Sequence, residues 1–432
     1  MSYRDALNIF DLQELARRRL PFPLYSYIEG GVEDNQARDN NRSVFQRIRF
    51  RPRSPVDVSR LSQSVELFGH RFDSPFGISP MGIGGVFAFE ADLKMARAAV
   101  RMNVPFTLSA FSTFPMEEVA KHSTHARWLQ GYMDKDRELS LKWINRAAAA
   151  DGDVVMISTD TPVRSNRENN VRSGFSLPLR VTPRLLFQGA MHPRWTVETF
   201  ARTLMKYGVP QLENLTVNGR PSLLEPPMKG DMRSGRSAVD WELMRFLRDK
   251  WKGALLVKGT LHAADAEMAV RVGLDGVVVS NHGGRQLDGA VSPIEAIPEI
   301  RAAAGGKLKI LADSGFRRGT DLIKGLALGA DFILLGRPAM FAVAAGGEEG
   351  VVHALSLLKS EVDSGLGLLG CPSVEDLDPS FLNVGDLFPL GPPGRQAGPE
   401  REPLRPMLSV AGNRLVGASA PQRIPHTEGE LS

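Results

Sequence analysis

The sequence has a single cysteine, no long apolar run and little excess charge, and each absence excludes a class of protein. Cys371 alone cannot form a disulfide within the chain, so a secreted disulfide framework is excluded and a cytoplasmic location is expected. No run of 18 apolar residues predicts a transmembrane helix, and residues 1–11 lack the basic-then-apolar layout of a signal peptide. The net charge of +4 is spread over 432 residues without a block of like charges, so nucleic acid is not expected as a partner.

Eight short apolar runs, rich in β-branched residues, are spread along the chain with helical patterns between them. The runs cover residues 76–80, 106–110, 128–132, 154–159, 255–259, 276–281, 309–315 and 332–338. Near-continuous apolar runs are typical of parallel strands that are covered on both faces. Eight strands alternating with helices predict an α/β fold of the closed (β/α)8, or TIM, barrel type. An open doubly wound sheet is the alternative.

Three segments fall outside the predicted barrel of residues 76–383. Residues 1–75 form an N-terminal helical cap, with a helix predicted over residues 5–19. A long insertion, about 165–239, separates the fourth and fifth strands, and connections of this length are usually lids, binding loops or disorder. Residues 384–432 hold eight of the 29 prolines and are expected to be a disordered tail.

The C-terminal ends of the predicted strands carry polar groups, and in a TIM barrel the active site lies at these ends. In strand order the residues there are Ser79 to Gly82, Ser109, Gln130 with Tyr132, Ser158 to Asp160, Lys258, Ser280 to His282, Asp313 to Gly315, and Gly336 with Arg337. A barrel without a ligand would not need polar groups at every strand end. The pattern therefore predicts a polar ligand.

The loops after the last two strands both combine glycine with arginine. Gly315 is followed by Arg317, and Gly336 by Arg337. Loops at these places often bind phosphate through backbone N–H groups, a helix N-terminus and a basic side chain. A phosphorylated ligand is therefore predicted, either a substrate or a flavin. Ordinary turns with solvated arginines are the alternative.

His282 is the natural acid–base candidate, because an imidazole changes its charge near neutral pH. Arg285, three residues later, suits a carboxylate clamp, and Asp160 suits the role of a carboxylate that orients the imidazole. A base next to a clamp fits a 2-hydroxy acid, whose carboxylate is held while the neighbouring carbinol reacts. A surface loop is the alternative for His282 and Arg285. Lys258 is open to three interpretations: a Schiff-base nucleophile, a charge partner for a flavin, or a surface lysine.

Several motifs resemble one known family over roughly residues 5–380. The motifs are residues 280–288 (SNHGGRQLD), 25–31 (YSYIEGG), 256–259 (LVKG), 313–321 (DSGFRRGTD) and 335–338 (LGRP). Together they resemble the FMN-dependent 2-hydroxy acid oxidases and dehydrogenases, most closely the branch of mandelate dehydrogenase and bacterial FMN-type L-lactate dehydrogenase.

The resemblance implies FMN as the cofactor and a role for each matching residue. His282 resembles the base that removes the hydroxyl proton, Asp160 its carboxylate partner, and Tyr132 a tyrosine near the substrate hydroxyl. Tyr27, Arg167 and Arg285 resemble the groups that hold the substrate carboxylate. The residues that resemble flavin contacts are Pro80, Gly82, Ser109, Gln130, Ser158, Lys258, Ser280, Asp313, Gly315, Arg317, Gly336 and Arg337, with Lys258 beside the flavin N1 and O2. No metal ligand is expected.

The resemblance also implies oxidation of an L-2-hydroxy acid, lactate- or mandelate-like, to the 2-oxo acid. The electron acceptor is a quinone, a cytochrome or oxygen; with oxygen the enzyme would be an oxidase that forms hydrogen peroxide. Gly82, Met81 and Phe111 depart from the residues usual in oxidases and favour the dehydrogenase branch. A homotetramer is expected because tetramers are common in the family.

In the mandelate dehydrogenase branch the long insertion can meet a membrane, which suggests a peripheral position on its inner face. The residues suited to such contact are Leu185, Leu186, Phe187, Lys206, Leu223, Leu224 and Arg233, and a solvated lid is the alternative.

Two other functions are compatible with a phosphate-binding barrel. One is another FMN or phosphate enzyme, such as an isomerase or a nucleotide dehydrogenase. The latter needs a cysteine in the active-site loop, and Cys371 lies beyond the eighth strand. The other is a non-catalytic binding protein, which would not need His282, Arg285 and Asp160 together.

Overall fold

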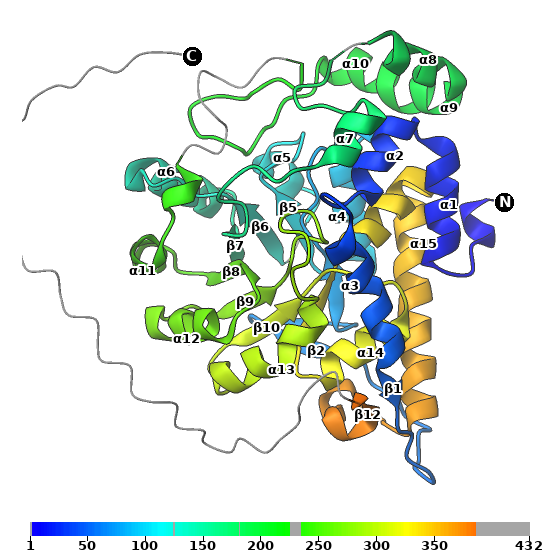
Figure 1. The fold of residues 1–432 in the computed structure, drawn as a ribbon, viewed down its shortest axis with the longest axis vertical. Coiled ribbons are helices and arrows are strands. Elements are labelled where there is room, and N and C mark those ends of the chain that lie inside the picture. Colours follow the sequence, from blue (N-terminus) through cyan, green and yellow to red (C-terminus); the bar gives the residue numbers. More distant parts are fainter. Residues whose placement is uncertain (1, 124–125, 181, 225–234, 386–432) are drawn as a thin grey trace, which may run out of the picture. The chain divides into compact units, whose positions relative to one another are not determined.

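The computed structural model contains a closed barrel of eight parallel strands, in the order β10-β11-β4-β5-β6-β7-β8-β9 (Figure 1). The strands are β4 (Phe76–Ile78), β5 (Phe106–Ser109), β6 (Arg127–Gly131), β7 (Val154–Ser158), β8 (Ala254–Thr260), β9 (Gly276–Val279), β10 (Lys309–Ala312) and β11 (Phe332–Leu335). The structure describes residues 2–123, 126–180, 182–224 and 235–385. All eight predicted strands and the closed barrel are confirmed, and the open-sheet alternative is wrong.

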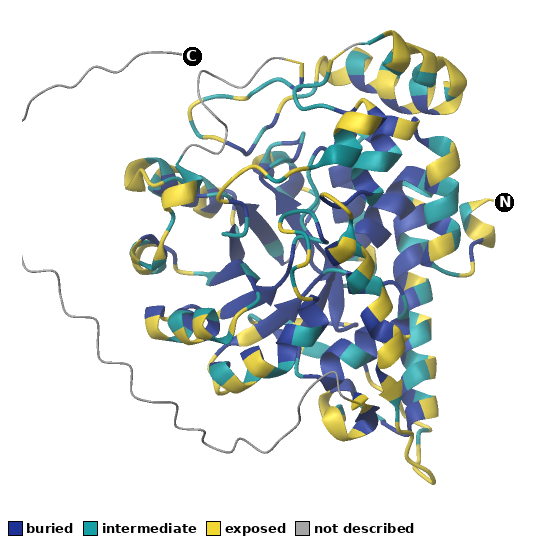
Figure 2. Cartoon of the chain, in the orientation of Figure 1, coloured by how far each residue is buried: buried dark blue, intermediate teal, exposed yellow. Residues whose placement is uncertain are grey.

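A helix follows each barrel strand before the next strand begins. These helices are α4 (Ala91–Arg101), α5 (Met116–Ala120), α6 (Arg137–Ala149), α11 (Trp241–Lys250), α12 (Ala263–Val272), α13 (Pro293–Ala304), α14 (Gly319–Ala327) and α15 (Arg337–Leu369). These helices form an outer layer around the barrel: the strands are buried, whereas α6, α11, α12 and α13 are exposed on their outer faces (Figure 2). A helix with one apolar side satisfies both environments.

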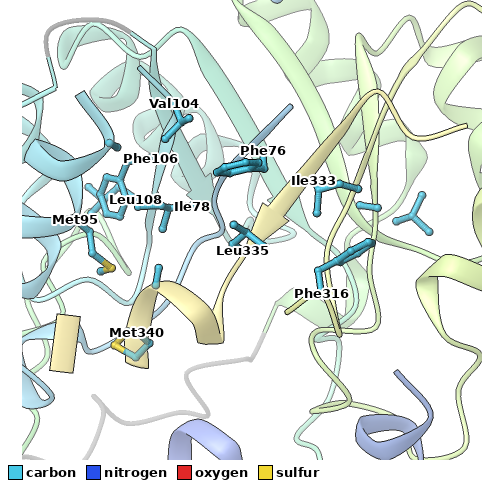
Figure 3. Packing of buried hydrophobic residues seen from close by; sticks show 14 of the residues in the cluster. Phe76, Ile78, Met95, Val104, Phe106, Leu108, Phe316, Ile333, Leu335 and Met340 are labelled. Atoms are coloured by element: carbon cyan, nitrogen blue, oxygen red, sulfur yellow. The ribbon is translucent and has the colours of Figure 1, made fainter. Parts of the chain in front are cut away.

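The core lies between the strands and these helices. Side chains of β4 and β5, among them Ile78 and Leu108, are fully or almost fully buried in one cluster with Met95 of α4 (Figure 3). A second cluster fills the barrel interior at the end where the strands begin. There, Phe72 contacts the rings of Trp128 and Phe332 at 6.0 and 5.8 Å between centroids. The hairpin of β2 (Val65–Leu67) and β3 (His70–Phe72) carries Phe72 and covers that end.

The N-terminal cap consists of a 3-10 turn, η1 (Tyr3–Asp5), and three helices, α1 (Ile9–Arg19), α2 (Phe22–Glu29) and α3 (Gln36–Arg47). The predicted helix over residues 5–19 begins only at Ile9, because the Asn8 side chain accepts the free N–H groups of Phe10 and Asp11. After α3, β1 (Arg49–Phe50) pairs antiparallel with β12 (Leu382–Asn383), so the end of the cap meets the last described strand.

The insertion between β7 and β8 is largely helical. It contains α7 (Glu168–Ser173), α8 (Pro183–Met191), α9 (Pro193–Trp195), the π-helical turn η3 (Thr196–Ala201), α10 (Arg202–Tyr207) and the 3-10 turn η4 (Arg236–Ala238). It is anchored to the cap: Arg19 forms an ion pair with Glu198 at 2.6 Å, and the Phe22 N–H donates to Gln188 Oε1 at 3.2 Å. The insertion therefore lies over α1 and α2 (Figure 1).

Helix α15 is long and apolar enough, by length and composition, to cross a membrane, but its surroundings identify it as a core helix. Half of its most apolar window is buried. It packs against α1, α4 and α14, and it bends at Gly347, whose φ is +61°. After it come two 3-10 turns, η5 (Val374–Asp376) and η6 (Pro379–Phe381). The tail predicted to be disordered, residues 384–432, lies outside the described residues except for Val384 and Gly385. The division of the chain at 75/76 and 383/384 stays a prediction.

Candidate active site

A cavity of about 700 Å³ opens at the C-terminal ends of the barrel strands. It is lined by every residue predicted for the site except Asp160 and Ser280, which stand directly behind the lining. Asp160 contacts His282, and Ser280 contacts Lys258. Residues from eight strand ends, the cap and the insertion thus meet at one place, as the barrel topology dictates.

His282 and Asp160 form a hydrogen-bonded pair. Nδ1 of His282 lies 3.1 Å from both carboxylate oxygens of Asp160. Since the carboxylate is an acceptor, it selects the tautomer with the proton on Nδ1 and leaves Nε2 as the basic atom. Burial lowers the pKa of His282 most strongly, and Lys258 and Arg167 add to this, while Asp160 opposes it. His282 is therefore neutral, and able to accept a proton, at neutral pH.

Lys258 is held in a buried ion pair. Its Nζ lies 2.8 Å from Asp313 Oδ2 and donates to Ser280 Oγ at 2.7 Å, and Lys258 is only 3% exposed. Burial disfavours the ammonium, but Asp313 and Asp160 outweigh it and raise the pKa of Lys258. A lysine whose pKa is raised is charged at neutral pH, which suits a charge partner for an anionic ligand better than a Schiff base, because the latter requires the neutral amine. The surface-lysine interpretation is wrong, because the side chain is buried.

Arg285 and Arg167 line the same cavity as His282. Nη1 of Arg285 donates to the main-chain carbonyls of Tyr27, at 2.6 Å, and Gly30, at 2.8 Å, and the group lies over the Tyr27 ring. Within the described part of the chain only Nη1 finds acceptors, so Nε and Nη2 remain for an anion in the cavity. Burial lowers the pKa of Arg285 to about 9, which still leaves it cationic at neutral pH. The alternative of a solvated surface loop is wrong for both His282 and Arg285.

The two Gly-Arg loops behave differently from each other. Arg317 is 6% exposed, and among the described residues its side chain donates only to its neighbour's carbonyl, that of Phe316, at 2.9 Å. Each guanidinium nitrogen of Arg337, in contrast, donates to a main-chain carbonyl, among them those of Ile28 and Gly283 at 2.9 Å. Arg317 therefore has more N–H groups left for an anion than Arg337, which ties α2 to the His282 loop. The alternative of two ordinary turns with solvated arginines is wrong, because Arg317 and Arg337 are both buried.

The wall of the cavity at the ends of β5, β6 and β7 is a hydrogen-bonded polar network. Gln130 Oε1 accepts from Ser109 Oγ at 3.2 Å, and Gln130 Nε2 donates to Ser158 Oγ at 3.1 Å. Near it, a Cβ placed on Gly82 would lie 2.6 Å from Cβ of Phe111, so glycine is what lets these two loops approach. Pro80 and Gly336 line the same wall.

The residues present fit FMN. The lining contains seven cationic side chains, Arg164, Arg167, Arg236, Lys258, Arg285, Arg317 and Arg337, against one carboxylate, Asp313. Such an excess suits two anionic groups, a phosphate and a carboxylate. The volume lies within the ordinary range of ligand pockets, about 300–1,000 Å³. Among the described residues there is no group of three or more His, Cys, Asp or Glu side chains arranged to hold a metal ion.

Three contacts of the site were not predicted from the sequence. Arg236 lies over the ring of Tyr132 at 4.0 Å, and Phe175 packs on Tyr27 at 4.4 Å between ring centroids. Both come from the insertion, whose approach to the barrel no local pattern reveals. Asn41, on α3, is hydrogen-bonded to Asn281; the only sequence signal for it is a polar residue on the apolar side of a helix.

Comparison with known proteins gives consistent matches. The model of the FMN-dependent dehydrogenase family matches residues 16–384. (S)-mandelate dehydrogenase of Pseudomonas putida is 39% identical, over 88% of this chain and 94% of the relative. L-lactate dehydrogenase of Alcaligenes faecalis is 37% identical, over 86% and 97%. A crystal structure described as a monotopic membrane protein, (S)-mandelate dehydrogenase, superposes with a TM-score of 0.82 at 38% identity, covering 88% of this chain and 100% of that one.

Proposed function

This chain belongs to the FMN-dependent dehydrogenase family, and from that premise we propose that it oxidises an L-2-hydroxy acid to the 2-oxo acid with His282 as the base. It is an FMN-dependent 2-hydroxy acid dehydrogenase of the mandelate- and lactate-like group. The observation that carries the proposal is the joint position of the His282–Asp160 pair, the Arg285 and Arg167 guanidinium groups and Lys258 on one cavity. An isomerase or a simple binding protein would not need this combination.

The substrate carboxylate is held by the open N–H groups of Arg285 together with Arg167. Arg167 is itself oriented, because its Nη2 donates to Gln286 Oε1 at 3.2 Å and its Nε donates to the Arg285 carbonyl at 3.3 Å. Two guanidinium groups, with Tyr27 stacked under one of them, fix the direction of the acid. The carbinol next to the carboxylate then points at the imidazole.

His282 takes the hydroxyl proton on Nε2, and the resulting imidazolium is stabilised by Asp160. FMN, when bound, supplies the two-electron acceptor that receives the hydrogen from C2. Lys258 would hold the flavin ring and Arg317 the phosphate of that cofactor, while Ser109, Gln130 and Ser158 would offer it hydrogen bonds. Tyr132, beside Phe111, closes the substrate side of the cavity.

Anaerobic bleaching of the purified holoenzyme tests the reaction. A panel of L-lactate, glycolate, mandelate and longer 2-hydroxy acids is mixed with the yellow protein, and the flavin absorbance is followed. At least one L-acid should bleach the flavin, and His282→Ala should keep FMN but lose bleaching. A flavin-free protein that does not rebind FMN, or bleaching of His282→Ala at the wild-type rate, contradicts the proposal.

We further propose that the electrons pass to a quinone or another acceptor at a membrane, with the insertion as the contact surface. Exposed apolar side chains gather on α8 to α10: Leu186, Phe187, Met191, Val197, Phe200 and Met205, with exposed fractions from 48% to 80%. Basic residues stand among them, including Arg194 and Lys206. Such a surface fits an anionic lipid bilayer. Of the residues predicted for this contact, Leu223 is buried at 2%, so its prediction is wrong, and Arg233 lies outside the described residues.

Sedimentation with vesicles that contain anionic lipid tests the contact. The wild-type protein should sediment with them, and Phe187→Glu should weaken this at least tenfold. Leu368→Glu is the matched control, because Leu368 is 81% exposed but lies on α15. Equal binding by all three proteins contradicts the membrane contact.

The rates of flavin reoxidation with a soluble quinone and with air show whether oxygen is the acceptor instead. Light scattering checks the predicted homotetramer.

A further inference from the structure

The loop that carries the base has an unusual backbone. His282, Gly283 and Gly284 all have positive φ, at 57°, 70° and 73°. The two glycines adopt this conformation freely, but His282 carries a Cβ, and such residues rarely occupy it unless their surroundings impose it. Its own N–H donates to Ser280 Oγ at 3.0 Å. The direction of the imidazole therefore depends on whatever holds this loop.

Asn41, on α3 of the N-terminal cap, holds the loop from outside the barrel. Its Nδ2 donates to Asn281 Oδ1 at 2.8 Å, and Asn281 Nδ2 donates back to Asn41 Oδ1 at 2.7 Å. Both amides are buried, at 1% and 4% exposure. Asn281 Oδ1 also accepts the N–H of Gly284 at 3.0 Å, so the amide pair joins the residue before His282 to the second residue after it.

Helix α3 is attached to the barrel on both sides of Asn41. Its free N-terminal N–H groups donate to Asp288, which lies on the same loop as His282; the Ala37 N–H does so at 2.8 Å. One turn later, Arg42 donates to Asp321 at 2.9 Å, and Asp321 accepts the N–H of Arg317 at 3.0 Å. Helix α3 therefore connects the base loop to the predicted phosphate loop, and Asn41 sits between the two attachments.

We propose that Asn41 is a positioning residue for the reaction: through Asn281 it fixes His282 in the backbone conformation that places its imidazole against Asp160 and toward the substrate. The proposal deepens the proposed function, because it takes His282 as the base. Asn41 itself is not among the described residues that line the cavity, so we expect it to act through Asn281 rather than by direct contact with a ligand. Its removal should therefore slow the chemical step more than it weakens binding, since a misplacement of about 1 Å can cost about a hundredfold in rate.

The variant Asn41→Ala tests this, with Asn214→Ala as the matched control. Asn214 is also 1% exposed and also bonded through both ends of its amide, to Phe114 O at 2.8 Å and to the Met116 N–H at 2.9 Å. In anaerobic stopped-flow, Asn41→Ala should reduce the limiting rate of flavin reduction about 10- to 100-fold, with the substrate dissociation constant within about threefold. The control should keep the wild-type rate. Equal rate losses in both variants, or no loss in Asn41→Ala, overturn the proposal.

A double-mutant cycle separates positioning from general destabilisation. If Asn41 acts through Asn281, adding Asn41→Ala to Asn281→Ala should cost less than about threefold further in the reduction rate. Multiplicative effects of the two substitutions would show that Asn41 acts elsewhere, and would overturn the proposal.

A measurement without substrate keeps the test independent of the proposed function. In proton NMR of the holoenzyme, the low-field resonance of the Nδ1 proton between His282 and Asp160 is identified by its loss in His282→Ala. It should be lost or broadened in Asn41→Ala and retained in Asn214→Ala. If the resonance is retained in Asn41→Ala, the positioning role is overturned, whether or not a hydroxy acid bleaches the wild-type flavin. If no hydroxy acid bleaches the wild-type flavin, that result contradicts only the proposed function.

Discussion

Asp160→Asn is the substitution that probes the proposed base most directly. The asparagine keeps the shape of the side chain and an oxygen that accepts the Nδ1 proton of His282, but it removes the charge. At 3.1 Å, a full charge on each partner would interact by about 5 kcal/mol with an effective dielectric constant of about 20. Because His282 is 23% exposed and Asp160 11%, and because the hydrogen bond remains, we expect about 3 kcal/mol to be lost when the imidazolium forms. That corresponds to a decrease of about 100-fold in the rate of flavin reduction.

The pH profile gives the sign of the effect. The neutral imidazole is the active form, so the reduction rate rises with pH through the pKa of His282, which burial holds below its ordinary value of 6.5. Asp160 is the group that opposes this lowering, so without its charge the pKa falls further. In Asp160→Asn the acidic limb should therefore move to lower pH while the plateau falls.

Stopped-flow bleaching under anaerobic conditions, from about pH 5 to pH 9, measures both quantities. Asp153→Asn is the control, because Asp153 lies 3.7 Å from His70 at the opposite end of the barrel; its plateau and limb should match those of the wild type. A plateau loss below about fivefold in Asp160→Asn, or an acidic limb that moves to higher pH, would refute the assigned roles.

Three further predictions concern binding and stability. Lys258→Met should lower the free energy of unfolding by about 3–5 kcal/mol at pH 7, because it leaves Asp313 buried without its partner. Urea titrations should show this deficit shrinking at pH 5, since the pKa of Asp313, held low by Lys258 in the wild type, rises in the variant and the folded state takes up a proton; an equal deficit at both pH values contradicts the pairing. Arg285→Lys should raise the substrate dissociation constant about 10- to 100-fold in anaerobic titrations with FMN content unchanged, because an ammonium lacks the planar fork; unchanged affinity contradicts the clamp. Gly315→Ala should cost about 2–4 kcal/mol and weaken FMN binding, because φ is +94° and a Cβ would collide with the Asn41 carbonyl; wild-type thermal stability and flavin retention would contradict this.

Most of the barrel could be predicted from the sequence, because its strands are marked locally. The run Val154–Ser158 is apolar except for its last residue, a pattern typical of a strand that is buried on both faces, and all five residues are buried. The order of the runs then places polar residues such as Lys258 and His282 at one end of the barrel. The start of the first helix did not follow from its apolar pattern: the helix begins at Ile9 and not at residue 5, because the Asn8 side chain caps it there.

The sequence alone therefore determined the barrel, the strand ends that face the cavity, and the His282, Arg285 and Gly-Arg loops, since each is encoded within a few consecutive residues. The tertiary structure alone decided which partners these loops meet. Asn41 and Asn281 are 240 positions apart, and Arg337 donates to carbonyls of α2 more than 300 positions away. Polar contacts of this kind leave no periodic pattern in either segment, because they depend on how the cap and the insertion pack against the barrel, and that packing fixes the direction of the base.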